Sequence, residues 1–199
     1  MNFKKQINKV LMDSLSDVMK ATFSAQPKVT EYRERKGRVS EKRLAVSMGL
    51  AGTPECSLLL MATNRMACRL VSKMLGAKIT TVNEDVADGV GELLNMVAGC
   101  FKRRYKKHNF EYGLSLPTVI LGLDDKSKVM IRKAKRLSLT VSLKPGVSFD
   151  FFCFYASSEP ADKNMKSFQS GEGIPEFQAQ NAMEALRALV DKREKNVSK

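Results

Sequence analysis

The sequence has few of the residues on which metal sites and disulfide frameworks are built. Its single histidine, His108, cannot form a histidine-based metal cluster or a conventional catalytic triad. Its cysteines lie far apart and never form a Cys-x-x-Cys pair, so we expect reduced thiols in the core of a cytoplasmic protein. The four cysteines are Cys56, Cys68, Cys100 and Cys153. The sequence therefore predicts neither a zinc site nor a disulfide framework.

Long apolar runs are lacking as well. No run approaches the roughly 20 residues that a helix needs to cross a bilayer, so we do not expect membrane insertion. The first residues are partly basic, but no uninterrupted apolar segment follows them, which argues against secretion. Apolar residues nevertheless make up 43% of the 199 residues, which is enough for a hydrophobic core. The length predicts one domain of ordinary size with room for an appendage.

The charge is unbalanced, with 34 basic and 21 acidic residues and a formal net charge of +13. Residues 159–199 are neutral overall, so the excess lies before them, mainly in clusters at residues 28–43, 102–107 and 126–136. Such clusters suit phosphate backbones, anionic membranes or acidic protein partners, or are simply a solvated basic surface. No helix-turn-helix, zinc-finger or RNA-binding aromatic motif accompanies them, so we do not expect nucleic acid as the partner.

The spacing of apolar residues predicts three helices. Apolar positions three and four residues apart predict helices at residues 3–23, 64–75 and 83–105. The second is preceded by capping residues at 63–64 and followed by Gly76, a residue typical of helix ends. The third begins at an asparagine that is followed by two acidic residues, which the helix dipole favours in a first turn.

Strands are predicted from two-residue alternation and from short apolar runs. The clearest cover residues 44–50, 56–61, 137–143 and 147–155. Residues 28–43 are polar and charged, and we interpret them as a loop or a ragged edge strand. Together with the helices, these strands predict an α+β domain in which an antiparallel or mixed sheet packs against long helices.

We interpret residues 157–199 as a C-terminal extension of a domain at residues 1–156. The extension begins with a polar stretch and ends in a predicted helix at about residues 175–191. The apolar residues on one side of this helix are Phe177, Ala182, Ala185, Leu186 and Leu189. We expect this side to pack against the domain or against a second copy of the chain.

The third predicted helix carries a polar line opposite its apolar face. At about 100° per residue, Asp88, Glu92, Asn95 and Gly99 follow one another at spacings of four, three and four residues, within about 60° of arc. Glycine costs roughly 1 kcal/mol in a helix, yet Gly91 and Gly99 both project away from the apolar stripe. Either a large partner approaches this face closely, or the helix is an ordinary solvent-facing one with tolerated glycines.

These residues also carry a resemblance to a known family. Asp88-x3-Glu92-x2-Asn95, followed by twenty-one residues and then Pro117, resembles the signature of the CheC/CheX/FliY family of response-regulator phosphatases. The resemblance extends over roughly residues 3–156. CheC-type members typically have two such motifs and this chain has one, so it is closer to the single-site CheX type. The flanking segments that also resemble the family are residues 49–52, 72–76, 91–99 and 116–122.

The resemblance implies a CheC-like fold and hydrolysis of the aspartyl phosphate on a CheY-like receiver domain. Asn95 would then orient the attacking water, and Glu92 would pair with the active-site lysine of the regulator. Asp88 would contact or orient the partner, Gly99 would let the partner's loops approach, and Pro117 would be a structural residue of the motif. The Mg²⁺ would be bound by the regulator, so we expect no metal and no cofactor on this chain.

Two other classes of function are compatible with the sequence. A non-catalytic binding module of the chemotaxis or flagellar-switch type would use the same fold for docking alone, and a nucleic-acid binder would rest on charge alone. The pair of Glu92 and Asn95 favours the enzyme, because a pure scaffold has no reason to present it. Because CheX relatives pair through their sheets, we also expect a homodimer.

Overall fold

The structure is a computed structural model that describes residues 3–32, 42–52, 55–107, 111–123 and 134–156. The predictions for His108, for the extension at residues 157–199 and for most of the basic cluster at residues 126–136 lie outside these residues. The helices are α1 (Phe3–Phe23), α2 (Asn64–Leu75) and α3 (Glu84–Lys106). The strands are β1 (Lys28–Glu31), β2 (Arg43–Gly52), β3 (Cys56–Thr63), β4 (Tyr112–Leu114), β5 (Thr118–Leu123), β6 (Ala134–Lys144) and β7 (Val147–Ala156).

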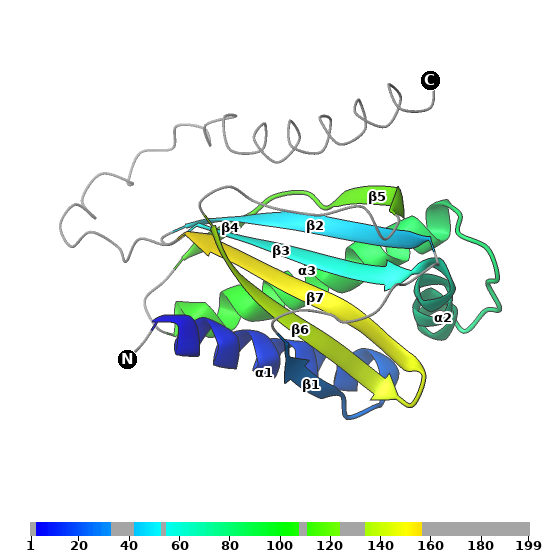
Figure 1. Cartoon of the computed structure of the whole chain (residues 1–199), viewed down its shortest axis with the longest axis horizontal. Coiled ribbons are helices and arrows are strands. Elements are labelled where there is room, and N and C mark those ends of the chain that lie inside the picture. Colours follow the sequence, from blue (N-terminus) through cyan, green and yellow to red (C-terminus); the bar gives the residue numbers. More distant parts are fainter. Residues whose placement is uncertain (1–2, 33–41, 53–54, 108–110, 124–133, 157–199) are drawn as a thin grey trace, which may run out of the picture.

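The described strands form one sheet of seven strands (Figure 1). Its order is β1-β6-β7-β3-β2-β4, and β5 pairs with β2 as well. Every pair in the sheet is antiparallel, which confirms the predicted α+β class with its antiparallel sheet. Because β4 and β5 follow different stretches of the same edge of β2, the short connection between them also lies along that edge.

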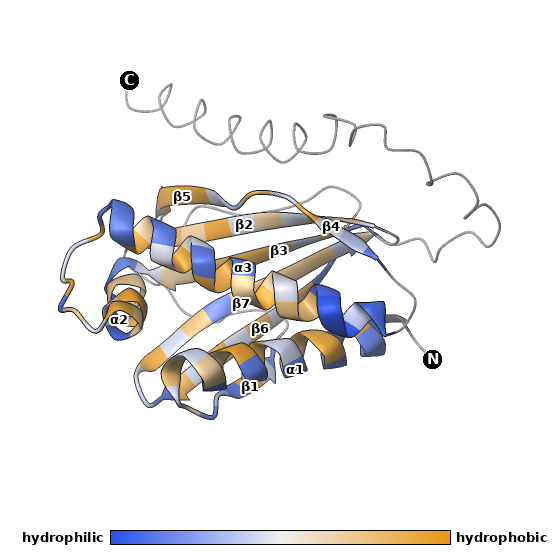
Figure 2. Ribbon diagram, turned by 180° about the vertical axis from the view of Figure 1, so that it is seen from behind, coloured by the Kyte–Doolittle hydropathy of each residue, from blue (hydrophilic) through white to orange (hydrophobic). Residues whose placement is uncertain are grey.

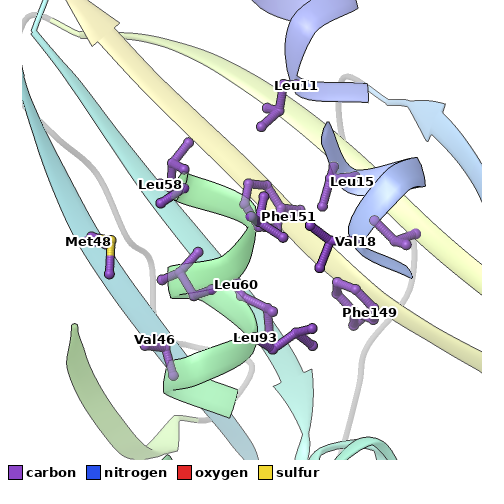
Figure 3. Close-up of a cluster of buried hydrophobic side chains, with 14 of the residues drawn as sticks. Leu11, Leu15, Val18, Val46, Met48, Leu58, Leu60, Leu93, Phe149 and Phe151 are labelled. Atoms are coloured by element: carbon purple, nitrogen blue, oxygen red, sulfur yellow. The ribbon is translucent and has the colours of Figure 1, made fainter. Parts of the chain in front are cut away.

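All three helices lie on one face of the sheet (Figure 2). The apolar residues that alternate along β2 and β7 point toward these helices and form the main core. Figure 3 shows side chains of α1, α3 and the sheet meeting there; those labelled are Leu11, Leu15, Val18, Val46, Met48, Leu58, Leu60, Leu93, Phe149 and Phe151. Along the described part of the chain, no helix combines the length and apolar character needed to cross a membrane.

The predicted helix boundaries are confirmed, together with the caps that set them. The hydroxyl of Thr63 accepts a hydrogen bond from the backbone N–H of Met66 at 3.2 Å, and Gly76 ends α2 with a left-handed φ of 66°. Asn83 caps α3 in the same way, because its side chain accepts from the N–H of Val86 at 3.1 Å. This cap fixes where α3 begins and therefore which of its residues face the solvent.

Two further details refine the sequence-based assignment. Within the polar segment at residues 28–43, the edge-strand interpretation holds for β1, which pairs with β6. Strand β4 was not predicted, because three residues are too few to show alternation. The cysteines are all buried and free, as expected for reduced core thiols.

Candidate active site

The polar line predicted on α3 lies on its solvent side. Asp88, Glu92 and Asn95 are exposed, whereas Val90 and Leu94 on the opposite side have no exposed surface. The three polar side chains are therefore held by a helix whose other face is fixed in the core, which restricts how the site can move.

Glu92 and Asn95 contact each other directly. The Nδ2 of Asn95 donates a hydrogen bond to Oε2 of Glu92 at 3.3 Å. This bond uses one amide hydrogen, so the other hydrogen and the carbonyl oxygen of Asn95 are still able to bind a water. The two residues thus present a carboxylate and a carboxamide as a pair at one point of the surface.

Pro117 lies over α3 beside this pair, although it is 22 residues further along the chain than Asn95. A Cβ built on Gly91 would lie 3.8 Å from Cγ of Pro117, and Gly91 is buried. The expectation that Gly91 faces solvent is therefore wrong. It sits on the flank of the helix, where Pro117 of the same chain covers it and no partner is needed to explain the glycine.

The connection from β4 to β5 is anchored to β2 just before Pro117. The backbone N–H of Ser115 donates to the carbonyl of Gly49 at 3.0 Å, and the N–H of Gly49 donates to the hydroxyl of Ser115 at 2.9 Å. Leu116 lies between Ser115 and Pro117 in this connection and is 87% exposed. The sequence did not single out Leu116, because a single apolar residue in a connection has no periodicity to reveal it.

The other two glycines of α3 differ from Gly91. A Cβ on Gly89 would lie 2.7 Å from a methyl carbon of Val71, so Gly89 permits close packing of α2 against α3. Gly99 lies on the exposed line one turn after Asn95. Among the described residues, a Cβ there would meet only the guanidinium of Arg103, whose Nη1 would be 3.6 Å away. Gly99 therefore leaves the surface next to Asn95 without a protruding side chain.

Comparison with known proteins matches this arrangement to a family. The family model described as "Chemotaxis phosphatase CheX" matches residues 44–141, a range that contains Glu92, Asn95 and Pro117. The chain belongs to the CheC/CheX/FliY family. Among curated proteins, none matches it.

Solved structures of CheX proteins share the fold. CheX from Desulfovibrio desulfuricans is 22% identical with a TM-score of 0.64, over 75% of this chain and 99% of that one. CheX from Vibrio vulnificus is 23% identical with a TM-score of 0.63, over 75% and 99% of the two chains. CheX in the CheX–CheY–BeF₃–Mg²⁺ complex from Borrelia burgdorferi is 19% identical with a TM-score of 0.62, over 74% and 96%. The predicted CheC-like fold is therefore confirmed.

The basic cluster that ends α3 is partly an internal structural feature of this CheX-family domain. Arg104 forms ion pairs with Asp17 and, at 3.8 Å, with Asp13, and both acids belong to α1. Lys106 pairs with Glu111 at 3.3 Å. Lys102 and Arg103 are exposed and have no ion pair with any residue that the structure describes. They belong to the same solvent-facing side of α3 as Glu92 and Asn95.

Several buried titratable groups lie near the other end of the sheet, away from Glu92 and Asn95. Burial raises the pKa of Tyr105 and Tyr112, so both phenols stay neutral at physiological pH. The pKa of Cys153 is raised as well, mainly by a hydrogen bond with Cys56 and in addition by burial. Within the described ranges, no three histidine, cysteine, aspartate or glutamate side chains gather in a way that would hold a metal ion.

Proposed function

We propose that this chain hydrolyses the aspartyl phosphate of a CheY-like receiver domain. The observation that carries the proposal is the exposed, hydrogen-bonded pair of Glu92 and Asn95 on α3, beside Pro117, in a family described as chemotaxis phosphatases. The CheX–CheY–BeF₃–Mg²⁺ complex of a relative supports a receiver domain as the partner. Such a partner would place this chain in the cytoplasm.

The proposed reaction requires few catalytic groups on the phosphatase. An aspartyl phosphate is an acyl phosphate, so its P–O bond is already activated and no strong nucleophile is required. A water attacks phosphorus, the bond to the aspartyl oxygen breaks, and the products are inorganic phosphate and a free carboxylate, with the water's proton released to solvent. The chain has only to hold that water in line, while Mg²⁺ bound to the receiver stabilises the developing charge.

Asn95 is the residue suited to hold the water. A carboxamide accepts and donates hydrogen bonds without changing its charge, so it orients a water and remains in place throughout the reaction. The bond that Asn95 donates to Glu92 restricts its rotation before the partner arrives. This restriction lowers the entropy that is lost when the reacting groups are aligned.

Glu92 is proposed to fix the register of the complex. Its carboxylate, held beside Asn95, would pair with the active-site lysine of the receiver domain. Asp88 lies one turn before Glu92 on the same exposed line and would contact the partner at its rim. The chain itself would use no cofactor, and Mg²⁺ would belong to the receiver.

Replacing Asn95 and Glu92 should separate catalysis from binding. The assay is release of phosphate from a CheY-type receiver domain that has been phosphorylated with acetyl phosphate in the presence of Mg²⁺. Asn95→Ala should lose dephosphorylation but bind the beryllofluoride-activated receiver with nearly normal affinity. Glu92→Lys should weaken binding itself, because it places like charges together. Both residues are exposed, so the stability of the variants should be close to that of the wild type.

The control is Glu84→Lys, a charge reversal at an exposed position in the first turn of α3. It should keep both hydrolysis and binding, because Glu84 lies two turns before Glu92. If Asn95→Ala hydrolyses like the wild type, the proposed site is wrong. If the wild type binds the activated receiver without accelerating phosphate loss, the chain is the non-catalytic binding module, and the exposed Leu116 then belongs to a docking surface only.

A further inference from the structure

The exposed line of α3 continues beyond Asn95 into a cationic stretch that the proposed chemistry does not use. Lys102 lies seven residues after Asn95, which places it within about 20° of Asn95 around the helix axis. Arg103 lies eleven residues after Glu92 and within about 20° of it. Both side chains are exposed. A partner that covers Glu92 and Asn95 and extends further along α3 therefore reaches these cations next.

The side chain of Arg103 points back toward the site. Its Nη1 is 3.6 Å from the position that a Cβ of Gly99 would occupy, so the guanidinium lies over the glycine one turn before its own Cα. Gly99 is only about 6 Å along the helix from Asn95. The missing side chain at Gly99 therefore gives the guanidinium room to lie within about one turn of the proposed water-binding residue.

Internal contacts and the helix dipole explain other members of the cluster better than these two. Arg104 pairs with acids of α1, and Lys106 pairs with Glu111. Lys102 and Arg103 have no ion pair among the residues that the structure describes. The helix dipole favours cations at the C-terminal end of a helix. The side chain of Arg103 points toward Gly99 and so places its charge away from that end.

The surface next to Lys102 is also hollowed. Lys102 and Lys106 line an open depression of about 310 Å³ together with Glu111, Tyr112 and Gly113. This depression is large enough to accept one or two side chains of a partner. Glu111 pairs with Lys106 inside this depression, so Lys102 is the lysine there that is left to attract a carboxylate of a partner.

We propose that Lys102 and Arg103 form a cationic docking site for acidic side chains of the receiver domain, beside its phosphorylated aspartate. The inference rests on the proposed function, because the receiver must lie over Glu92 and Asn95 for its rim to reach this site. The exposed side of α3 carries acidic residues before Asn95 and basic residues after Gly99. A partner with basic groups facing the first stretch and acidic groups facing the second would therefore bind in one orientation only. The fork of the Arg103 guanidinium suits a carboxylate.

The test reverses two charges in the full-length chain and uses a CheY-type receiver domain that the wild type binds. Lys102→Glu combined with Arg103→Glu should raise both the Kd for the beryllofluoride-activated receiver and the KM for the phosphorylated receiver by about tenfold. The value of kcat should stay unchanged, because neither residue contacts the reacting atoms. The salt dependence of kcat/KM should become weaker, since attraction between opposite charges is screened by salt.

The matched control is Arg69→Glu on α2, a charge reversal at another exposed arginine, which lines a different depression with Phe23 and Lys144. It should leave Kd, KM and the salt dependence unchanged. A receiver in which an acidic residue next to the phosphorylation site is replaced by lysine should bind the Lys102→Glu, Arg103→Glu variant better than it binds the wild type.

Three results would overturn the docking site. One is a reversed variant with wild-type Kd and salt dependence. Another is an equal loss in Arg69→Glu, which would show an effect of net charge alone. The third is a fall in kcat at constant KM, which would mean that Lys102 or Arg103 acts on the phosphoryl group instead. The proposed function has its own test, because it fails if Asn95→Ala remains active. If the wild type binds the receiver without dephosphorylating it, the docking site is still decided by comparing the Kd of the reversed variant with that of the wild type.

Discussion

At the scale of single residues, the three glycines of α3 show what helical spacing predicts and what it does not. Spacing placed Asp88, Glu92, Asn95 and Gly99 on the solvent side, where the structure has them. It failed for Gly91 because a position on the flank of a helix is buried or exposed according to what another segment brings there. Pro117 brings that cover, and nothing near Gly91 in the sequence indicates it.

The neighbours of Gly89 and Gly91 predict opposite effects of the same substitution. In Gly89→Ala the new Cβ would lie 2.7 Å and 2.8 Å from the methyl carbons of Val71, and overpacking of this kind costs about 1–3 kcal/mol. In Gly91→Ala the Cβ meets Pro117 at 3.8 Å, an ordinary contact, so the gain in helix propensity of up to about 1 kcal/mol should prevail.

Urea unfolding should therefore give a lower free energy of unfolding for Gly89→Ala than for the wild type, and an equal or higher one for Gly91→Ala. Each variant is the control for the other, because both replace glycine by alanine in the same helix. Equal stability of the two variants would mean that α2 shifts away from α3 at no cost.

At the scale of elements, the predictable parts are those with a repeating pattern or a cap. Helix α3 was found from its apolar spacing and its asparagine cap, and β2 from its alternation. The connection between β4 and β5 has neither, yet it places Pro117 over Gly91 of α3 and leaves Leu116 exposed. Its position depends on hydrogen bonds between Ser115 and Gly49, which are 66 residues apart and leave no local signal.

Leu116 should contribute to partner binding and not to folding. It is already 87% exposed, so Leu116→Ser should leave the melting temperature unchanged. If the receiver covers it, the substitution removes apolar burial worth about 1.5–3 kcal/mol at most, so the affinity for the beryllofluoride-activated receiver should fall by about tenfold. Titration calorimetry with that receiver measures the change.

Leu75→Ser is the matched control, because Leu75 is 60% exposed at the end of α2. It should leave the affinity unchanged. A wild-type affinity for Leu116→Ser would place this leucine outside the contact surface, while an equal loss in both variants would point to a general effect of surface hydrophobicity.

At the scale of the whole molecule, the phosphatase fold accounts for most of the chain but not all of it. CheX from Desulfovibrio desulfuricans matches over 99% of its own length and 75% of this chain, so about a quarter of this chain has no counterpart there. The extension at residues 157–199, with its predicted helix at about residues 175–191, lies outside the described residues and stays a prediction from sequence. Residues 159–199 have no net charge, so the net positive charge belongs to the part of the chain that carries the candidate site.

The edge of the sheet at β6 gives a physical reason to expect a homodimer. Strand β6 has eleven residues, whereas β1 has four and pairs with only the stretch from Leu139 to Ser142. Just before that stretch, the backbone N–H of Tyr32 donates to the carbonyl of Ser138 on the outer edge of β6. We therefore expect a second copy of the chain to pair with this edge, because strand edges favour pairing with another strand.

Sedimentation equilibrium at tens of micromolar should give twice the chain mass of 22.2 kDa. Amide exchange at Ala134 and Arg136 of β6 should slow as the concentration rises through the dissociation range. Their backbone groups face the outer edge, as that of Ser138 does, so pairing there would protect their N–H groups. The amides of α3 report in the same experiment as a control, since their hydrogen bonds lie within the helix and should not respond to concentration. A monomer at these concentrations would contradict the homodimer, and a dimer without added protection at β6 would place the contact on another surface.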